Sequence, residues 1–127
     1  MDEKKVGKIK SFKDLKIWNR GIKLVEDVYM VSKSFPKEET YGLRSQLRRS
    51  AVSIPSNIAE GFARFRNKEY RKFLYISLGS CAELTTQIII ASRLKYIEKN
   101  KADTMLSDID EISKMTTSLI KKLTTND

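Results

Sequence analysis

The sequence of 127 residues contains no histidine and a single cysteine, Cys81. The chain therefore lacks the usual general base near neutral pH and the commonest ligands of zinc. One cysteine also excludes an intrachain disulfide and is typical of proteins in a reducing compartment. Because Leu78, Ala82 and Leu84 are its apolar neighbours along the chain, we expect Cys81 to be a small core residue rather than a nucleophile.

Other functional signatures are missing as well. The sequence has no glycine-rich phosphate loop and no G-x-S-x-G nucleophile motif. Carboxylates gather only at Asp108, Asp110 and Glu111, which a helix would spread around its solvent side. The start, MDEKKVGKIK, lacks the apolar run of a signal peptide, and no segment approaches the roughly 20 apolar residues of a membrane span. We expect a noncatalytic cytoplasmic protein with no metal ion or other cofactor and no membrane partner.

Positive charge is concentrated in the first part of the chain. Residues 1–72 carry 18 Lys and Arg against 9 Asp and Glu, whereas residues 73–127 carry 7 against 7. The first part therefore supplies the whole formal net charge of +9. A field of this kind attracts nucleic-acid phosphates, acidic proteins or anionic membranes. The arginines between Arg44 and Arg71 are better candidates for phosphate contacts than the scattered lysines, because a guanidinium can bond two phosphate oxygens at once.

An apolar stripe runs through residues 43–66, LRSQLRRSAVSIPSNIAEGFARFR. Steps of 3 and 4 place its members on one side of an α-helix, and these are Leu43, Leu47, Ala51, Ile54, Ile58, Phe62 and Phe65. Pro55 cannot donate to the carbonyl of Ala51, so we expect one helix that is kinked there. Gly61 weakens the same helix, which is acceptable if a neighbouring backbone packs closely.

Three further segments show helical spacing. The first begins with a capping box at Ser11 and Asp14, has a seam that includes Trp18, and carries a second apolar strip that suggests a subunit interface. Asn67 is expected to cap the third helix, and Asn100 is expected to adopt a left-handed conformation in the turn before the fourth. The four predicted helices span about 12–33, 40–65, 68–97 and 102–123.

With short turns and no strand signal, these segments predict an all-α, antiparallel up-down-up-down four-helix bundle. It forms a single domain over residues 11–124, preceded by a flexible basic tail over residues 1–10.

Some of the candidate residues have structural alternatives. Glu83 lies among apolar residues of the third helix, and we expect an arginine of the second helix to pair with it or with Glu60. Part of the basic set would then be structural. Phe62 and Phe65 have the register of core residues, and Trp18 belongs to a seam, so we expect none of the three to stack on bases.

Several runs of the sequence carry a resemblance to a known family. They are FKDL at 12–15 followed by Trp18, SFP at 34–36, YGL at 41–43 and QLRRSAVSIPSNIAEG at 46–61. Together they resemble the four-helix bundle proteins encoded in intervening sequences of bacterial 23S rRNA genes, which are often named S23 ribosomal proteins. The RRSAVSIPSNIAEG run is also similar to accessory variability determinants of diversity-generating retroelements.

The resemblance implies an up-down four-helix bundle that assembles into a ring-like homopentamer, with no established enzymatic activity. It also implies binding of nucleic acid, RNA before DNA, through a basic surface, and the accessory relatives imply a reverse transcriptase as a protein partner. Carried onto this chain, the basic positions are Arg44, Arg48, Arg49, Arg64, Arg66, Arg71 and Lys72.

Three hypotheses of function follow. The first is a noncatalytic oligomeric module that binds RNA, with DNA as the alternative, through phosphates and with little sequence preference; several copies of a weak basic patch would add avidity. The second is a protein scaffold or adaptor for an acidic partner such as a reverse transcriptase. The third is a magnesium nuclease built from carboxylates, whose RNA cleavage EDTA would stop. A steep fall of RNA affinity with salt would favour the first.

Overall fold

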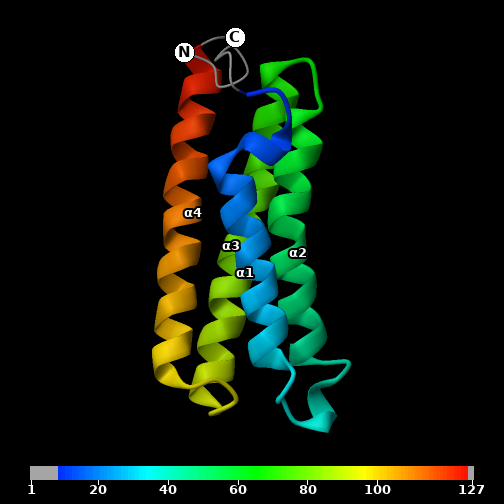
Figure 1. Cartoon of the computed structure of the whole chain (residues 1–127), viewed down its shortest axis with the longest axis vertical. Helices are drawn as coiled ribbons and strands as arrows, with labels where there is room; N and C mark the ends of the chain where they lie inside the picture. The colour runs from blue at the N-terminus through cyan, green and yellow to red at the C-terminus, as the bar shows by residue number, and fades with distance from the viewer. Residues whose placement is uncertain (1–8, 126–127) are drawn as a thin grey trace.

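Four long α-helices account for most of residues 9–125, the range that the computed structural model describes. They are α1 (Lys16–Ser32), α2 (Leu43–Phe62), α3 (Asn67–Arg93) and α4 (Lys99–Thr125), with short 3-10 helices η2 (Phe12–Asp14) before α1 and η3 (Lys37–Glu39) before α2. Successive helices run in opposite directions (Figure 1). The predicted all-α, antiparallel up-down-up-down bundle is confirmed. Residues 1–8 of the predicted basic tail lie outside the described range.

The core lies between the helices, with α2 packed on α1 and α3, and α4 packed on α3 and α1. Its apolar side chains come from every helix because each presents one apolar stripe inward. The largest fully buried side chains are Tyr70, Leu15, Leu24, Leu47, Ile54, Ile58, Leu74, Leu84, Ile88, Ile109, Ile112 and Leu123.

The capping box predicted at the start of the first helix is present, but it caps η2. Ser11 Oγ accepts a hydrogen bond from the Lys13 N–H at 3.2 Å, and Asp14 Oδ2 accepts one from the Ser11 N–H at 3.2 Å. Leu15 then adopts an extended conformation, with φ −79° and ψ 130°. The α-helix therefore begins at Lys16, four residues later than predicted.

The residues of α1 that are buried in the core belong mainly to the second apolar strip predicted for this helix, the strip that lies beside the Trp18 seam. Ile17, Leu24 and Val28 are buried, whereas Trp18 is only partly buried and Tyr29 is 40% exposed. Trp18 packs edge-on against Phe12, with their ring centroids 5.3 Å apart. Of the predicted seam, Leu15 is a core residue at 1% exposure, and the other members, Trp18, Ile22, Val25 and Tyr29, lie at the edge of the core. Both apolar strips of α1 therefore contact the bundle itself over most of their length, and the subunit interface suggested for this helix stays a prediction.

Helix α2 continues without a break through Pro55, so the prediction of one helix rather than two is confirmed. The proline ring is buried against α1, where a Cβ added to Gly21 would lie 3.2 Å from Pro55 Cβ. Helix α2 ends at Phe62, three residues before the predicted end. Phe62 packs on the core, but Phe65 is fully exposed at 103%, so its predicted core position is wrong. The turn after Phe62 carries Phe65 out of the helical register.

Both asparagine predictions at the helix ends are wrong. Arg66 occupies the N-cap position of α3, and the Asn67 amide instead donates to the Leu123 carbonyl at 3.5 Å. Helix α3 ends at Arg93 rather than near residue 97. The left-handed residue of the following turn is Lys95, with φ 66°. Asn100 lies in the first turn of α4, which begins earlier than predicted.

Helix α3 leaves a large part of its apolar surface outside the core. Its exposed large apolar side chains are Tyr75 (59%), Ile76 (43%), Ile89 (37%) and Ile90 (43%). By length and composition alone α3 would also be able to cross a membrane, with a mean hydropathy of 1.4 over its most apolar window. The length and composition of α3 therefore contradict the expectation that no segment approaches a membrane span. The core helix of a bundle can have the same length and composition as a membrane span. Leu74, Leu84 and Ile88 of α3 are fully buried in the bundle.

Two glycines give a matched test of the packing of α2 on α3. A Cβ at Gly61 would lie 2.9 Å from Phe73 Cβ and 2.9 Å from Tyr70 Cδ1, whereas a Cβ at Gly79 would meet no atom within 4 Å. We expect Gly61→Ala to lower the free energy of unfolding by about 1–3 kcal/mol through overpacking. Gly79→Ala should raise it by about 0.5–1 kcal/mol, because alanine favours an exposed helix interior.

Urea unfolding followed by circular dichroism measures both changes. Changes of the same sign in the free energy of unfolding of the two variants would contradict the close approach of α2 and α3 at Gly61.

Candidate nucleic-acid interface

Two of the predicted site arginines hold the end of α1. Arg48 Nε donates to Ser32 Oγ at 2.9 Å, its Nη2 donates to the Tyr29 carbonyl at 3.4 Å, and its guanidinium lies 4.4 Å from the Tyr29 ring centroid. Arg44 Nη2 donates to the Phe35 carbonyl at 3.0 Å. The last carbonyls of a helix have no partner within the helix, and a cation there also favours the helix dipole. The first role of Arg44 and Arg48 is therefore structural, because their guanidinium groups bond to the end of α1 and the turn after it.

Arg71 and Arg64 also bond to groups of the protein. Arg71 Nη1 donates to the Leu123 carbonyl at 3.1 Å, near the end of α4. Arg64 Nη2 lies 3.0 Å from Glu60 Oε1, and its guanidinium lies 4.8 Å from the Phe73 ring centroid. An internal ion pair with Glu60, which the sequence left open, is therefore present, and Arg64 makes it.

The expected partner of Glu83 is not found among residues 9–125. Glu83 is exposed and lines a polar pocket of about 420 Å³ with Gln46, Arg49, Ser50, Ser53 and Gln87. The structure gives no ion pair for Glu83 within the described part of the chain. Its position on the outer side of α3 lets solvent satisfy the carboxylate.

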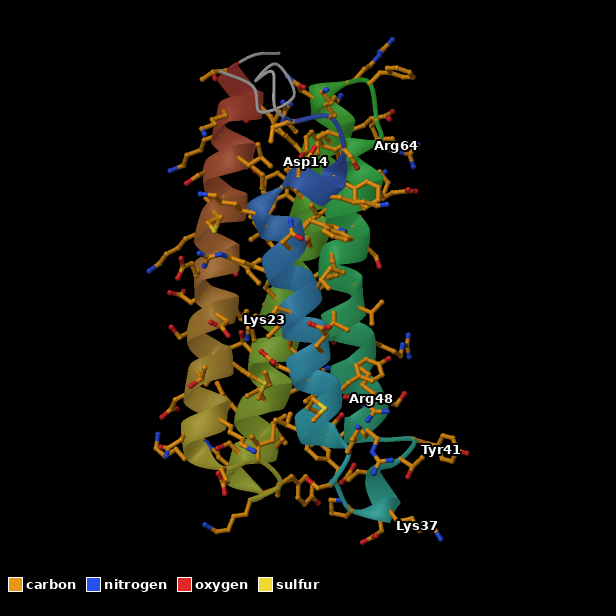
Figure 2. All side chains as sticks on the ribbon, in the orientation of Figure 1. Asp14, Lys23, Lys37, Tyr41, Arg48 and Arg64 are labelled. Carbon is orange, nitrogen blue, oxygen red and sulfur yellow. The ribbon has the colours of Figure 1, made fainter. Side chains whose placement is uncertain are left out.

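Three of the seven predicted basic residues remain free to meet a ligand. Arg49, Arg66 and Lys72 are exposed, and no hydrogen bond or ion pair of their side chains is found in the described range. The predicted basic set also divides in space, since Arg48 and Arg64 lie toward opposite ends of α2 (Figure 2). The residues that the sequence grouped along one helix therefore do not form one patch.

One end of the bundle combines exposed cations with an exposed aromatic ring. We call it the α2–α3 tip, formed by Phe65, Arg66, Lys68 and Lys72, all of them exposed. Within residues 61–72 the only carboxylate is Glu69. The α4 end lies beside the tip, because Arg71 bonds to the Leu123 carbonyl. The sequence predicts a core position for Phe65, and no base stacking, because its spacing continues the α2 stripe, and its exposure makes that prediction wrong.

The opposite end carries a groove, which we call the tyrosine–arginine groove. It has a volume of about 650 Å³, and its lining residues are Tyr29, Thr40, Tyr41, Arg44, Ser45, Arg48, Arg49, Val52 and Ser53. None of these lining side chains is acidic. Tyr41 stands out from the connection between α1 and α2, with Arg48 beside it on α2 (Figure 2). Tyr41 belongs to a run that carries the family resemblance, but sequence analysis assigned it no role, although its position outside every apolar stripe is a signal of exposure.

The titratable groups elsewhere do not assemble a reactive centre within residues 9–125. Burial raises the pKa of the Cys81 thiol, partly opposed by a hydrogen bond with Ser113, which keeps the thiol protonated and unreactive. No three His, Cys, Asp or Glu side chains gather there in a way that would hold a metal ion. Asp110 pairs with Lys114 at 3.0 Å, and Glu111 pairs with Arg20 at 2.6 Å.

The chain is thus a basic four-helix bundle in which Arg66 and Lys72 lie at the α2–α3 tip and Arg49 lines the tyrosine–arginine groove. The model of the 23S rRNA-intervening sequence protein family matches residues 13–118, and the chain belongs to this family. The fold is similar to the crystal structure of a Bacteroides thetaiotaomicron protein of unknown function from the S23 ribosomal protein family. The TM-score is 0.77 at 22% identity, over 83% of this chain and 98% of that chain. The search of curated proteins gave no match.

The division between structural and free arginines predicts different effects for two neighbours on α2. Arg48→Ala should lower the free energy of unfolding by about 1–3 kcal/mol, because it removes bonds from a charged donor to the end of α1. Arg49→Ala should change it by less than about 0.5 kcal/mol, as expected for an exposed side chain without partners. Chemical denaturation compares the two. Equal losses of unfolding free energy in the two variants would mean that Arg48 does not stabilise the end of α1.

Proposed function

We propose that the protein is a noncatalytic oligomeric module that binds nucleic acid, RNA in preference to DNA, through phosphate contacts with little sequence preference. The observation that carries the proposal is the α2–α3 tip, where the exposed Arg66, Lys68 and Lys72 closely follow the exposed Phe65 in the sequence. Cations that are not engaged by carboxylates can neutralise phosphates and release the counterions condensed on the nucleic acid, which drives nonspecific binding. An exposed ring beside them suits single-stranded regions, whose bases can stack on it.

Membership of the family is consistent with this role but does not define it. The resemblance of the RRSAVSIPSNIAEG run to accessory variability determinants extends the proposal to a reverse transcriptase as a protein partner. We place the module in the cytoplasm, in line with its single buried cysteine. A scaffold for an acidic protein is the competing role, and its binding would depend on that partner and would resist high salt.

We further propose that the exposed apolar face of α3 is the contact between copies of the chain. We define this face by Tyr75, Ile76, Ile89, Ile90 and Leu94, which are 37% to 59% exposed. Positions 75–76 and 89–90 are four turns of helix apart and lie on one side of α3. Such a stripe on a helix is typical of a surface that another chain covers. A ring of copies would then repeat the tip and add avidity.

Charge reversal at the tip tests the nucleic-acid proposal. We expect Arg66→Glu, Lys68→Glu, Lys72→Glu to weaken binding of a labelled oligouridylate and to flatten the slope of log K against log[salt] by about 2, since each lost single-strand phosphate contact removes about 0.7. The fold should survive, because acidic residues suit a helix N-terminus. Fluorescence anisotropy across a salt series gives the affinity and the slope.

The matched control is Lys99→Glu, Lys101→Glu, Lys114→Glu on α4, which removes the same net charge. Lys99 and Lys114 pair with carboxylates in the folded chain. We expect this variant to keep most of the salt slope. Equal losses in both variants would mean that net charge rather than the tip drives binding, and no binding by the natural chain at low salt would contradict the proposal and favour the adaptor.

Substitution on α3 tests the subunit contact. We expect the natural chain to form an oligomer, five copies of the 14.7 kDa chain by the family resemblance, and Ile76→Glu with Ile90→Glu to release folded monomers, because a buried contact cannot accept unpaired charges. Met30→Glu is the control, since Met30 is a 63% exposed apolar residue on α1. Native mass spectrometry measures the mass. A monomeric natural chain would refute the oligomer, and release by Met30→Glu alone would place the contact on α1.

A further inference from the structure

The tyrosine–arginine groove lies at the opposite end of α2 from the α2–α3 tip and is not explained by the phosphate contacts proposed there. It is concave, and its lining combines aromatic rings, guanidinium groups and hydroxyls without a carboxylate. Of the carboxylates close to this lining, Glu39 is engaged: Oε1 accepts from the Leu43 N–H at 2.9 Å and Oε2 lies 3.4 Å from Tyr96 Oη. Glu83 lines the adjoining polar pocket, which shares Arg49 and Ser53 with the groove, and is exposed to solvent. The groove therefore suits a planar ligand that carries negative charge.

Within the groove, two side chains are available for new contacts. Tyr41 is 96% exposed, so its ring makes almost no contact with the bundle. The other ring, Tyr29, is already covered by the Arg48 guanidinium at 4.4 Å. Arg49 is exposed and has no side-chain partner among the described residues, whereas Arg44 and Arg48 are bonded to the end of α1 and the turn after it. A free ring and a free guanidinium thus face one cavity.

A nucleotide has a base, which can stack on a free aromatic ring, and a phosphate, which can bind a free guanidinium. A base stacks on a tyrosine regardless of its identity, and a phosphate accepts two hydrogen bonds from a guanidinium. Val52, which is 40% exposed, supplies an apolar wall of the same groove. A base within a duplex is covered on both faces by its neighbours, so only an unpaired base can use the ring.

We propose that the tyrosine–arginine groove binds an unpaired nucleotide of a single strand, with its base on Tyr41 and its phosphate on Arg49. The proposal rests on the nucleic-acid function above and adds a second, stacking contact to it. It strengthens the preference for single strands over duplexes that the exposed Phe65 ring already gives the tip. Neither side chain supports the fold, so both can be changed without loss of structure.

The test measures binding of labelled oligouridylate and of a labelled RNA duplex by fluorescence anisotropy at one fixed salt concentration. Tyr41→Ala should weaken single-strand binding about 5- to 100-fold, the usual effect of removing one stacking ring. It should leave duplex binding within about 2-fold of the natural chain. Tyr41→Phe keeps the ring and should retain single-strand affinity within about 2-fold. Arg49→Gln should weaken single-strand binding at that salt concentration, and a separate salt series of this variant should show a flatter salt dependence, because one phosphate contact is lost.

The outcomes separate this proposal from the proposed function. If Tyr41→Ala binds the single strand as tightly as the natural chain while the tip variant loses affinity, the groove proposal is overturned and the nucleic-acid function stands. If the natural chain binds neither probe at low salt, both proposals fall. Equal weakening of single-strand and duplex binding by Tyr41→Ala would also overturn stacking, because a duplex offers no free base.

A free mononucleotide carries the same base and phosphate as a nucleotide within a single strand. A competition experiment distinguishes these two ligands. We expect adenosine monophosphate to displace the single strand only at concentrations far above the Kd of the strand, because it lacks the neighbouring phosphates. Displacement at concentrations near that Kd, lost in Tyr41→Ala, would assign the groove to a free nucleotide and overturn the single-strand assignment.

Discussion

The close packing of α2 between α1 and α3 is the constraint on which the rest of the structure depends. At one contact Gly21 leaves room for the Pro55 ring, and at the other Gly61 leaves room for Phe73. These contacts fix the rotation of α2 about its axis, since its buried stripe must face the core. Everything on the outer side of α2, including Arg49 and the groove beside it, takes its position from that rotation.

The arginines of this protein divide according to whether a helix end lies within their reach. Arg44 and Arg48 bond to carbonyl and hydroxyl groups at the end of α1, and Arg71 bonds to a carbonyl near the end of α4. A guanidinium can satisfy such carbonyls and keep its charge, so a basic side chain is not by itself a ligand contact. Loss of binding after a change at Arg48 would therefore report on the fold as much as on a nucleic acid.

The two ends of the bundle offer different chemistry to the same class of ligand. The α2–α3 tip presents three exposed cations and the exposed Phe65 ring, which suits several phosphates of a strand and one unpaired base. The tyrosine–arginine groove presents a ring and a guanidinium in a hollow, which suits one unpaired nucleotide. If α3 joins copies into a ring, both kinds of contact are repeated around it, and weak contacts combine into useful affinity.

Helical spacing in the sequence determined the fold class, the four helices and the burial of Leu47, Ile54 and Ile58, because apolar periodicity records which side of a helix faces the core. Motifs in the sequence determined the family. Tertiary structure alone decided where each helix stops, which put Phe65 in solvent and the left-handed turn at Lys95. It also decided which arginines are free, because a hydrogen bond such as that from Arg71 to Leu123 joins residues far apart in the chain, which no local spacing encodes.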